Sequence, residues 1–327
     1  MRKRNPLRGL IKFCILLVLI LAMIYSGLQI MESTVLIPEE ESTQTVGTKT
    51  IVRDGISYFP RQDITVMLVM GIDQSGPAQH SNYYRNEGSA DSVMLLIFDE
   101  TAQNCNVLYL NRDTMVNIET IGVRGEYAGL AYGQLGLAHT YGSGLEDSCE
   151  NVKSTLLRMI HGLTIDYYVS MRLDAIPILN DAVGGVTVNI VDDFSDIDYR
   201  LTKGPVTLHG SQVLTFIQSR RYVGDQMNVT RMERHKEYVS SFLQAFRAKG
   251  DEDIDFIVNV YDQVSPYLVT DCSVTVLTNM MEKYAGYPLN EVVSPEGRNI
   301  LGDEHYEFYL DEEKFDDLIL RLFYAPK

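Results

Sequence analysis

A basic segment between Gln218 and Lys236 carries the residue types best suited to bind an anion. It holds four arginines and one lysine against two acids, whereas the whole chain of 327 residues has a formal charge of −16. Arginine suits phosphate in particular, because its planar guanidinium donates two parallel hydrogen bonds. The basic residues are Arg220, Arg221, Arg231, Arg234 and Lys236.

The second half of this segment predicts the start of a helix. Thr230 and Glu233 have the spacing of a capping box, and apolar residues recur at helical intervals after them. In that frame Arg231 and Arg234 share a face at the positive end of the helix dipole, where arginine is unfavourable unless an anion binds. We interpret the pair as an anion site; the alternative is a solvated basic face that pairs with nearby carboxylates. The apolar positions are Met232, Val239, Phe242, Leu243 and Phe246.

Two carboxylates and a further arginine mark the ends of predicted strands. Asp73 follows one apolar run, Asp91 begins the next, and Arg112 and Asp113 follow a third. If the first two strands are antiparallel neighbours, Asp73 and Asp91 fall at the same edge of a sheet. Paired carboxylates beside arginines suit Mg²⁺ or Mn²⁺ bridging phosphate oxygens. The alternative is that each Asp only ends a strand or begins a turn.

The elements that must position these residues alternate between strands and helices along the chain. This alternation predicts an α/β fold, an α/β/α sandwich around a mixed central β-sheet. Residues 122–144 are expected to be a long loop with room for a short helix, residues 192–205 are expected to be a loop, and the acidic residues 251–327 are expected to pack on the same domain. Strands are predicted at 63–71, 90–98, 106–110, 165–173 and 186–191, and helices at 145–160, 174–183 and 209–217.

The N-terminus has the pattern of a membrane anchor. Residues 1–12 carry five basic residues and no acid, and residues 13–30 are uncharged. Eighteen helical residues span about 27 Å, close to the apolar thickness of a bilayer. The positive-inside rule predicts a cytoplasmic segment 1–12, a single transmembrane helix 13–30, a polar stalk 31–60 and an extracellular domain 61–327. A cleaved signal peptide is the alternative, but no small-x-small cleavage site follows the apolar run.

Charge and cysteine content exclude several classes of partner. A charge of −16 for the chain and +5 for residues 1–12 leaves −21 on the remainder, which disfavours nucleic acid as a partner. Outside the predicted anchor, Cys105, Cys149 and Cys272 are isolated, with no CxxC pair and no Cys/His metal spacing. We interpret them as small apolar residues with at most one disulfide.

Seven short motifs follow one another behind the predicted anchor. They are Val69–Asp73, Ala90–Leu96, Asn111–Thr114, Ile165–Val169, Asp181–Val186, Leu208–Leu214 and Arg231–Arg234. Each is unspecific alone, but their order is highly specific. On these motifs the chain resembles, from about residue 63 to 246, the LytR-CpsA-Psr (LCP) family of membrane-anchored glycopolymer ligases.

The resemblance implies an activity and its partners. Family members transfer a phospho-glycopolymer, such as a teichoic acid or a capsule-like polymer, from a polyprenyl pyrophosphate carrier to a peptidoglycan hydroxyl. The product is a phosphodiester formed outside the membrane. The implied protein is a metal-dependent phosphotransferase of the cell membrane, and its polyprenyl-linked donor lies in an apolar tunnel. Alternatives are a polyprenyl-pyrophosphate pyrophosphatase, with water as acceptor, and a non-catalytic wall-binding regulatory ectodomain.

The resemblance also implies a set of site residues. Phosphoryl transfer depends mainly on positioning and charge neutralisation, which agrees with carboxylates and arginines as its machinery. Implied metal ligands for Mg²⁺ or Mn²⁺ are Asp73 and Asp91; implied catalytic residues are Asp91, Arg112 and Arg220; implied pyrophosphate-binding residues are Arg112, Arg220, Arg231, Arg234 and Arg85.

Four positions depart from the common family pattern. Ser89 and Gln218 stand where arginine is frequent, Asn228 stands where aspartate is frequent, and His235 replaces a frequent glutamine. Arg85 is a candidate substitute for the arginine missing at Ser89. These changes suggest a subfamily with another donor or with altered catalytic competence, and we interpret His235 as a polar helix residue instead of a general base.

Overall fold

The computed structural model describes residues 50–326, except 54, 83–84, 123–125, 220–222, 224–227, 253–254, 274–275, 277–278, 281–282, 285 and 303–304. The predicted segments 1–12 and 13–30 lie outside these residues. Within them, no helix is long and apolar enough to cross a membrane. The folded part begins before residue 61, because β1 (Ile51–Arg53) and β15 (Tyr324–Pro326) both pair with β2 (Ile56–Pro60).

A six-stranded mixed sheet forms the centre of the protein. Its neighbouring pairs β8–β3 and β5–β12 are parallel, and the other three are antiparallel. β3 and β4 are therefore antiparallel neighbours, the arrangement on which the predicted carboxylate pair depends. The strand order is β11 (Leu268–Thr270), β8 (Tyr167–Arg172), β3 (Ile64–Ile72), β4 (Ala90–Asp99), β5 (Asn104–Leu110) and β12 (Leu289–Val293).

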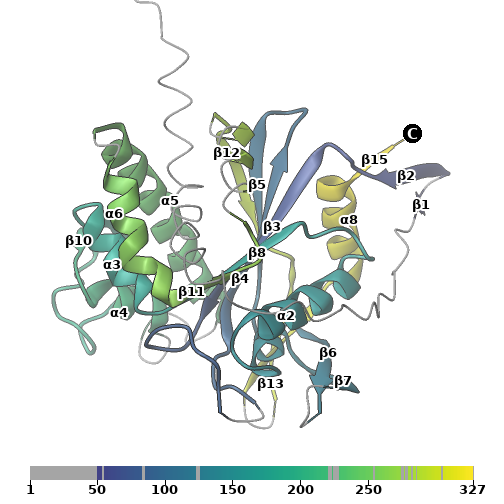
Figure 1. Cartoon of the computed structure of the whole chain (residues 1–327), viewed down its shortest axis with the longest axis horizontal. Coiled ribbons are helices and arrows are strands. Elements are labelled where there is room, and N and C mark those ends of the chain that lie inside the picture. Colours follow the sequence, from purple (N-terminus) through teal and green to yellow (C-terminus); the bar gives the residue numbers. More distant parts are fainter. Residues whose placement is uncertain are drawn as a thin grey trace, which may run out of the picture.

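Helices cover both faces of this sheet, as the predicted sandwich requires (Figure 1). Their apolar side chains form one core on each face, and the central strands are continuous apolar runs because both of their faces are buried. One face carries α3 (Ala175–Ala182), α4 (Gln212–Gln218), α5 (Asn228–Glu252) and α6 (Asp255–Val264), and the other carries α2 (Glu146–Met159) and α8 (Glu312–Phe323).

Besides the sheet of β1, β2 and β15, three two-stranded hairpins stand outside the central sheet in the described part of the chain, and two of them correct predicted loops. Strand β7 lies within residues 122–144, which were expected to be a loop, whereas η3 (Leu135–Thr140) agrees with the short helix considered there. The glycines and alanines of β7 give no clear apolar alternation, and pairing with β6 makes it a strand. The predicted loop 192–205 likewise overlaps the first two residues of β10. The hairpins are β6 (Met115–Ile121) with β7 (Tyr127–Gln134), β9 (Val186–Ile190) with β10 (Gly204–Leu208), and β13 (Gly297–Leu301) with β14 (Tyr306–Leu310).

Helix α5 begins at Asn228, earlier than expected. The predicted capping box is therefore wrong, because Thr230 lies inside the first turn instead of preceding it. Arg231 still lies in that first turn, so the predicted position of its side chain near the helix N-terminus stands. Further along the helix, Tyr238 and Phe242 are buried against the sheet and fix the face that α5 turns toward it.

Candidate active site

A β-bulge at the beginning of β4 positions Asp91. The register of β3 against β4 shifts between Gly71 and Ile72, and Asp91 is the extra residue on β4. Such a bulge re-aims a side chain and is frequent beside active sites. Asp73 continues β3 at the same edge, where its N–H donates to the carbonyl oxygen of Ser89 at 2.9 Å. The structure therefore brings Asp73 and Asp91 to one edge of the sheet, as the strand pattern predicts.

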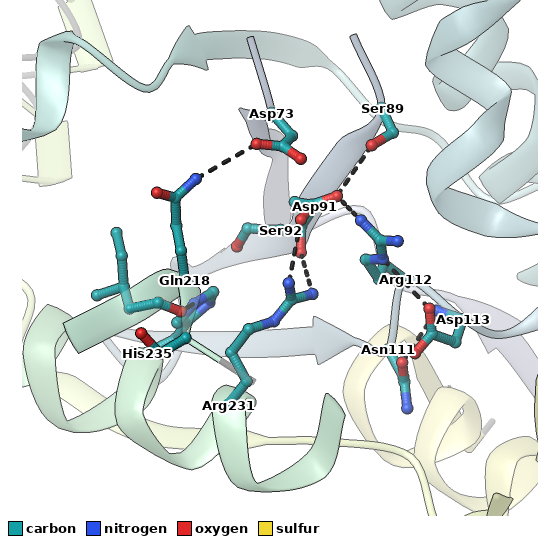
Figure 2. Close-up of polar contacts among 12 residues, drawn as sticks. Asp73, Ser89, Asp91, Ser92, Asn111, Arg112, Asp113, Gln218, Arg231 and His235 are labelled. Carbon is teal, nitrogen blue, oxygen red and sulfur yellow. Dashed lines mark hydrogen bonds and ion pairs between the residues drawn. The ribbon is translucent and has the colours of Figure 1, made fainter. Parts of the chain in front are cut away.

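Asp91 is the shared partner of two arginines (Figure 2). Nη1 of Arg231 donates to Oδ2 at 3.0 Å, and Nη2 lies 3.4 Å from the main-chain oxygen of Asp91. Arg112 forms an ion pair with the other carboxylate oxygen, Oδ1, which also accepts the hydroxyl of Ser89 at 2.9 Å. Ser89 thus supplies a neutral donor where the family frequently has a charged one. One carboxylate therefore sets the separation of the two guanidinium groups.

Residues in and near the turn after β5 fix the position of Arg112. Asp113 is 1% exposed and accepts Nε of Arg112 at 3.2 Å, while its own N–H donates to the side chain of Asn111 at 3.0 Å. Gly136 donates its N–H to the carbonyl of Arg112 at 2.8 Å. A Cβ on Gly136 would lie 2.8 Å from the main-chain oxygen of Ala90, so only glycine permits this close approach.

The guanidinium of Arg231 has a donor left over. Its side chain is only 5% exposed, and Nε is buried with no hydrogen-bond partner in the described part of the chain. Burial lowers the pKa of Arg231, but arginine stays charged in proteins. A buried donor without an acceptor costs about 1–3 kcal/mol, and native structures contain few of them. An anionic ligand that supplies an oxygen at this point would remove the cost.

The other predicted arginines lie in different surroundings. Arg234 is buried, with Nη1 bonded to Asp192 at 2.8 Å and Nε to the carbonyl of Phe216 at 2.9 Å, which ties α4 to α5. Arg85 donates to the hydroxyl of Thr140 at 2.7 Å, and its guanidinium stacks over the ring of Tyr141. Arg220 lies outside the described residues. Roles of these three arginines in pyrophosphate binding stay predictions.

His235 is held as a neutral ring. Its Nε2 lies 2.8 Å from the carbonyl of Ile217, which can only accept, so Nε2 carries the proton. Nδ1 then accepts the hydroxyl of Tyr109, and that hydroxyl in turn accepts from Ser92 at 3.3 Å. Burial, aided by the charge of Arg231, lowers the pKa of His235 to about 3. Both ring nitrogens are occupied, which agrees with a polar helix residue and not with a general base.

An apolar pocket opens at this cluster and runs between the sheet and helices α3 and α5. Alternate residues of β5, and of β4 from Ser92 to Leu96, line it, so β4 contributes positions over about 13 Å of its length. The lining is polar at one end, around Asp91 and Arg231. Sequence analysis could not assign this pocket, because its lining residues show the same pattern as an ordinary core. Lining residues include Ser92, Met94 and Leu96 on β4, Cys105, Val107 and Tyr109 on β5, and Tyr238, Val239 and Phe242 on α5.

Asp73 is the most accessible carboxylate of the cluster. It is exposed, and its Oδ1 accepts the side-chain amide of Gln218 at 3.3 Å (Figure 2). Gln218 is thus a neutral partner at another position where the family frequently has arginine. Among the described residues no three His, Cys, Asp or Glu side chains cluster as metal ligands. Asp73 and Asp91 could hold a hard cation only together with oxygens from water or from a bound phosphate, as Mg²⁺ often requires.

Buried neutral histidines should make the fold sensitive to acid. Burial lowers the pKa of His139 to about 4 and that of His235 to about 3. Because an unfolded histidine titrates near pH 6.5, the unfolded chain binds protons that the native state does not bind. Stability should fall from about pH 6.5 downward, by roughly 2 kcal/mol per histidine at pH 5. Denaturant unfolding at pH 7.5 and 5.0 measures this loss.

The variant His235→Gln separates the two histidines. Its amide can replace Nε2–H as the donor to Ile217, but it does not titrate. We expect the loss of stability between pH 7.5 and 5.0 to shrink by about half, since one of two titrating groups is gone. A pH dependence equal to that of the wild type would show that His235 is already protonated in the native state.

Comparisons with known proteins identify relatives of the chain. Residues 30–319 match the model of the LytR_cpsA_psr family. The polyisoprenyl-teichoic acid–peptidoglycan teichoic acid transferase TagU of Oceanobacillus iheyensis is 26% identical over 235 residues, covering 70% of this chain and 65% of that protein. TagU of Bacillus subtilis is 23% identical over 170 residues, 52% of this chain and 48% of that protein. The chain thus spans less than two thirds of the length of these relatives.

Solved structures share the fold. Protein gbs0355 from Streptococcus agalactiae superposes with a TM-score of 0.63 at 18% identity, covering 80% of this chain and 86% of that one. TagT bound to LIIa-WTA superposes with a TM-score of 0.58 at 21% identity, covering 80% of this chain and 90% of that one. At such identities the likeness shows a common architecture, the mixed sheet with helices on both faces.

Proposed function

Because the chain belongs to the LytR_cpsA_psr family, we propose that it transfers a phospho-glycopolymer, such as a teichoic acid, from a polyprenyl pyrophosphate carrier to a peptidoglycan hydroxyl. The relatives TagU are named as transferases of teichoic acid from a polyisoprenyl carrier to peptidoglycan. Nothing in those names favours a pyrophosphatase or a non-catalytic regulator. The donor polymer and the acceptor sugar belong to the proposal.

The observation that carries this proposal is a pocket whose lining is apolar along its body and polar at one end. An apolar body suits a polyprenyl chain, and the polar end presents Arg231, with its spare buried donor, beside Asp91 and Arg112. A molecule that fits both parts needs a long hydrocarbon and an anionic head. Charge-assisted hydrogen bonds in a partly dry site would bind that head strongly.

The proposed reaction exchanges one phosphorus–oxygen bond for another. An acceptor hydroxyl attacks the phosphorus that carries the glycopolymer and gives up its proton to a base. A P–O bond to the acceptor forms as the P–O bond to the bridging pyrophosphate oxygen breaks, and polyprenyl phosphate leaves. Arg231 and Arg112 would hold the phosphate oxygens and stabilise the charge that gathers on the leaving group.

The charge balance at this end of the pocket supports a cation. Asp73, Asp91 and Asp113 carry three negative charges, and Arg112 and Arg231 carry two positive charges. Lys236 also lines the pocket but is paired with Glu233, so these described residues have a net charge of −1. A pyrophosphate diester adds about two more negative charges. We propose Mg²⁺ or Mn²⁺ held by Asp73, Asp91 and phosphate oxygens, which when bound would neutralise charge on the pyrophosphate.

The proposed reaction also requires the domain to lie on the outer side of the membrane, where the peptidoglycan acceptor is. Positive charge in residues 1–12 and the apolar run 13–30 favour a domain that faces the wall. Protease added to intact protoplasts would then degrade this domain, and full protection would reject the orientation.

Transfer in vitro tests the proposal. The full chain in detergent is mixed with Mg²⁺, a polyprenyl-pyrophosphate-linked glycopolymer and insoluble peptidoglycan stripped of its own polymers. We expect glycopolymer to become covalently attached to the sedimented wall, with one polyprenyl monophosphate released for each polymer. An intact donor after long incubation with folded protein would reject the transferase activity.

A further inference from the structure

The outer face of the β6–β7 hairpin exposes large side chains. Val116 and Ile118 of β6 are buried, so the alternate residues lie on the opposite, outer face. There Asn117 is paired across the strands with Tyr132. Tyr132 is 60% exposed and Leu130 is 50% exposed. A gathering of exposed apolar side chains commonly marks a binding surface.

The β13–β14 hairpin continues this face. Phe308 is buried and bridges to Thr114 at the start of β6, so its neighbours Glu307 and Tyr309 lie on the outer side. A hydrogen bond from the Tyr309 hydroxyl to Glu307 at 2.6 Å raises the pKa of Tyr309, and Tyr132 acts on it in the same direction. Because Thr114 and Phe308 are paired and both are buried, the outer residues of the two hairpins, Tyr132 and Tyr309 among them, lie on one surface. The residues Asn117, Leu130, Tyr132, Glu307 and Tyr309 are called here the tyrosine face.

The residue that holds Arg112 also fixes both hairpins. The main-chain oxygen of Asp113 accepts the N–H of Phe308 at 2.9 Å. Gln134, the last residue of β7, donates its amide to Asp113 at 3.3 Å and to the carbonyl of Tyr306 at 2.8 Å. The tyrosine face is thus continuous with the turn that carries Arg112. Asn117 follows Arg112 by five residues, at most about 17 Å of extended chain. Figure 1 shows β6, β7 and β13 at the same end of the molecule.

The chemistry of this face suits a sugar chain. Tyrosine rings can stack on the apolar faces of pyranose rings, and their hydroxyls can also form hydrogen bonds. Asn117 and Glu307 add an amide and a carboxylate, which can bind hydroxyl and N-acetyl groups. Glu119, which lies opposite Leu130, is ion-paired with Arg158, and Arg298 lies opposite Tyr309, so acids and bases balance on this face and a neutral glycan suits it. Such a balanced surface lacks the cluster of lysines and arginines that binds an anionic membrane.

The geometry of the proposed transfer requires the acceptor to lie beside the polar end of the pocket. An attacking hydroxyl must come within about 3–3.5 Å of the phosphorus, so the acceptor chain must lie on a surface that adjoins the polar end of the pocket. We propose that the tyrosine face binds the glycan strand of the peptidoglycan acceptor, while the apolar pocket binds the donor. This inference rests on the proposed function and adds to it the location of the acceptor.

Two pairs of substitutions test the tyrosine face. Tyr132→Ala with Tyr309→Ala removes both rings, whereas Tyr132→Phe with Tyr309→Phe keeps them. Tyr199→Ala is the matched control, because Tyr199 is 81% exposed in the acidic loop. For the full chain in detergent, the alanine pair should weaken binding to stripped insoluble peptidoglycan tenfold or more. It should raise the acceptor KM similarly and leave the donor KM unchanged, while the phenylalanine pair and the control should stay within about threefold of wild type.

The outcomes separate this inference from the proposed function. Wild-type peptidoglycan binding or an unchanged acceptor KM in a folded alanine pair, with transfer intact, would overturn the tyrosine face and leave the transferase standing. A loss of binding that is confined to anionic lipid vesicles would also overturn it and assign the face to the membrane. If the wild type binds peptidoglycan but transfers nothing, and the alanine pair loses that binding, the face is supported and the transferase is rejected.

Discussion

Asp91→Asn should lower the rate of transfer about a hundredfold or more while the protein stays folded. Asp91 accepts Arg112 on one carboxylate oxygen and Arg231 on the other, and in the proposed function it also binds the cation. Asparagine keeps one carbonyl acceptor but carries no charge, so both guanidinium groups lose their ion pair with this residue. Removing this arrangement should cost several kcal/mol of transition-state stabilisation, at about 1.4 kcal/mol for each factor of ten.

Companion variants show whether this effect belongs to the site. Asp73→Asn should also slow Mg²⁺-dependent transfer strongly, because Asp73 shares the sheet edge with Asp91. Asp196→Asn removes an exposed charge from the acidic loop and should leave turnover unchanged. Wild-type turnover in both Asp91→Asn and Asp73→Asn, with unchanged circular dichroism, would remove the two carboxylates from the site.

Arg231→Lys should impair donor binding although it keeps the positive charge. Arg231 uses Nη1 and Nη2 on Asp91 and has Nε left for a ligand. Lysine has a single ammonium group, which can satisfy Asp91 or the ligand but cannot reproduce the planar fork. If the arginine were only part of a solvated face, lysine would be neutral, because exposed ion pairs contribute about 0–1 kcal/mol. Its 5% exposure argues against that alternative.

Arg231→Gln should separate ligand binding from fold stability. Asp91 keeps Arg112 as its partner in this variant, and a cation is removed from the positive end of the α5 dipole. The ligand-free protein should therefore melt at the wild-type temperature or slightly above it. The thermal shift that a polyprenyl pyrophosphate gives to the wild type should be absent.

Melting curves with and without this ligand measure both effects. Arg200→Gln serves as the control, since the Arg200 side chain is 57% exposed and pairs only locally with Asp198. It should keep the full ligand shift. A wild-type shift in Arg231→Gln would exclude Arg231 from the donor site.

The strands β3 and β4 were predictable from the sequence because they are continuous apolar runs with an acid at one end of each, whereas their antiparallel pairing was a condition of the sequence argument that the structure meets. Such runs are typical of central strands, and their antiparallel pairing brings Asp73 and Asp91 to one edge. The bulge at Asp91 was not predictable, since it depends on the register between two strands. The carboxylate could therefore be assigned to the site, but its bonds to Arg112 and Arg231 could not.

Features that depend on contacts between residues far apart in the sequence could not be predicted. Arg231 and Arg234 share a helical face in the sequence pattern, yet Arg234 is bonded to Asp192, 42 residues away, and to the carbonyl of Phe216. No local pattern contains that contact. Strand β7 was missed for a similar reason, because its pairing with β6, and not its glycine-rich sequence, makes it a strand. The pocket was hidden because its lining residues alternate as core residues do.

The fate of one phosphorus atom tests the proposed transfer most directly. A donor is prepared with ³²P only in the phosphate that carries the glycopolymer, and it is incubated with the full chain, Mg²⁺ and stripped peptidoglycan. The proposed reaction places the label in the sedimented wall, in a phosphodiester, and leaves unlabelled polyprenyl monophosphate in the lipid fraction. Label released as soluble glycopolymer phosphate, or retained in the lipid, would contradict it.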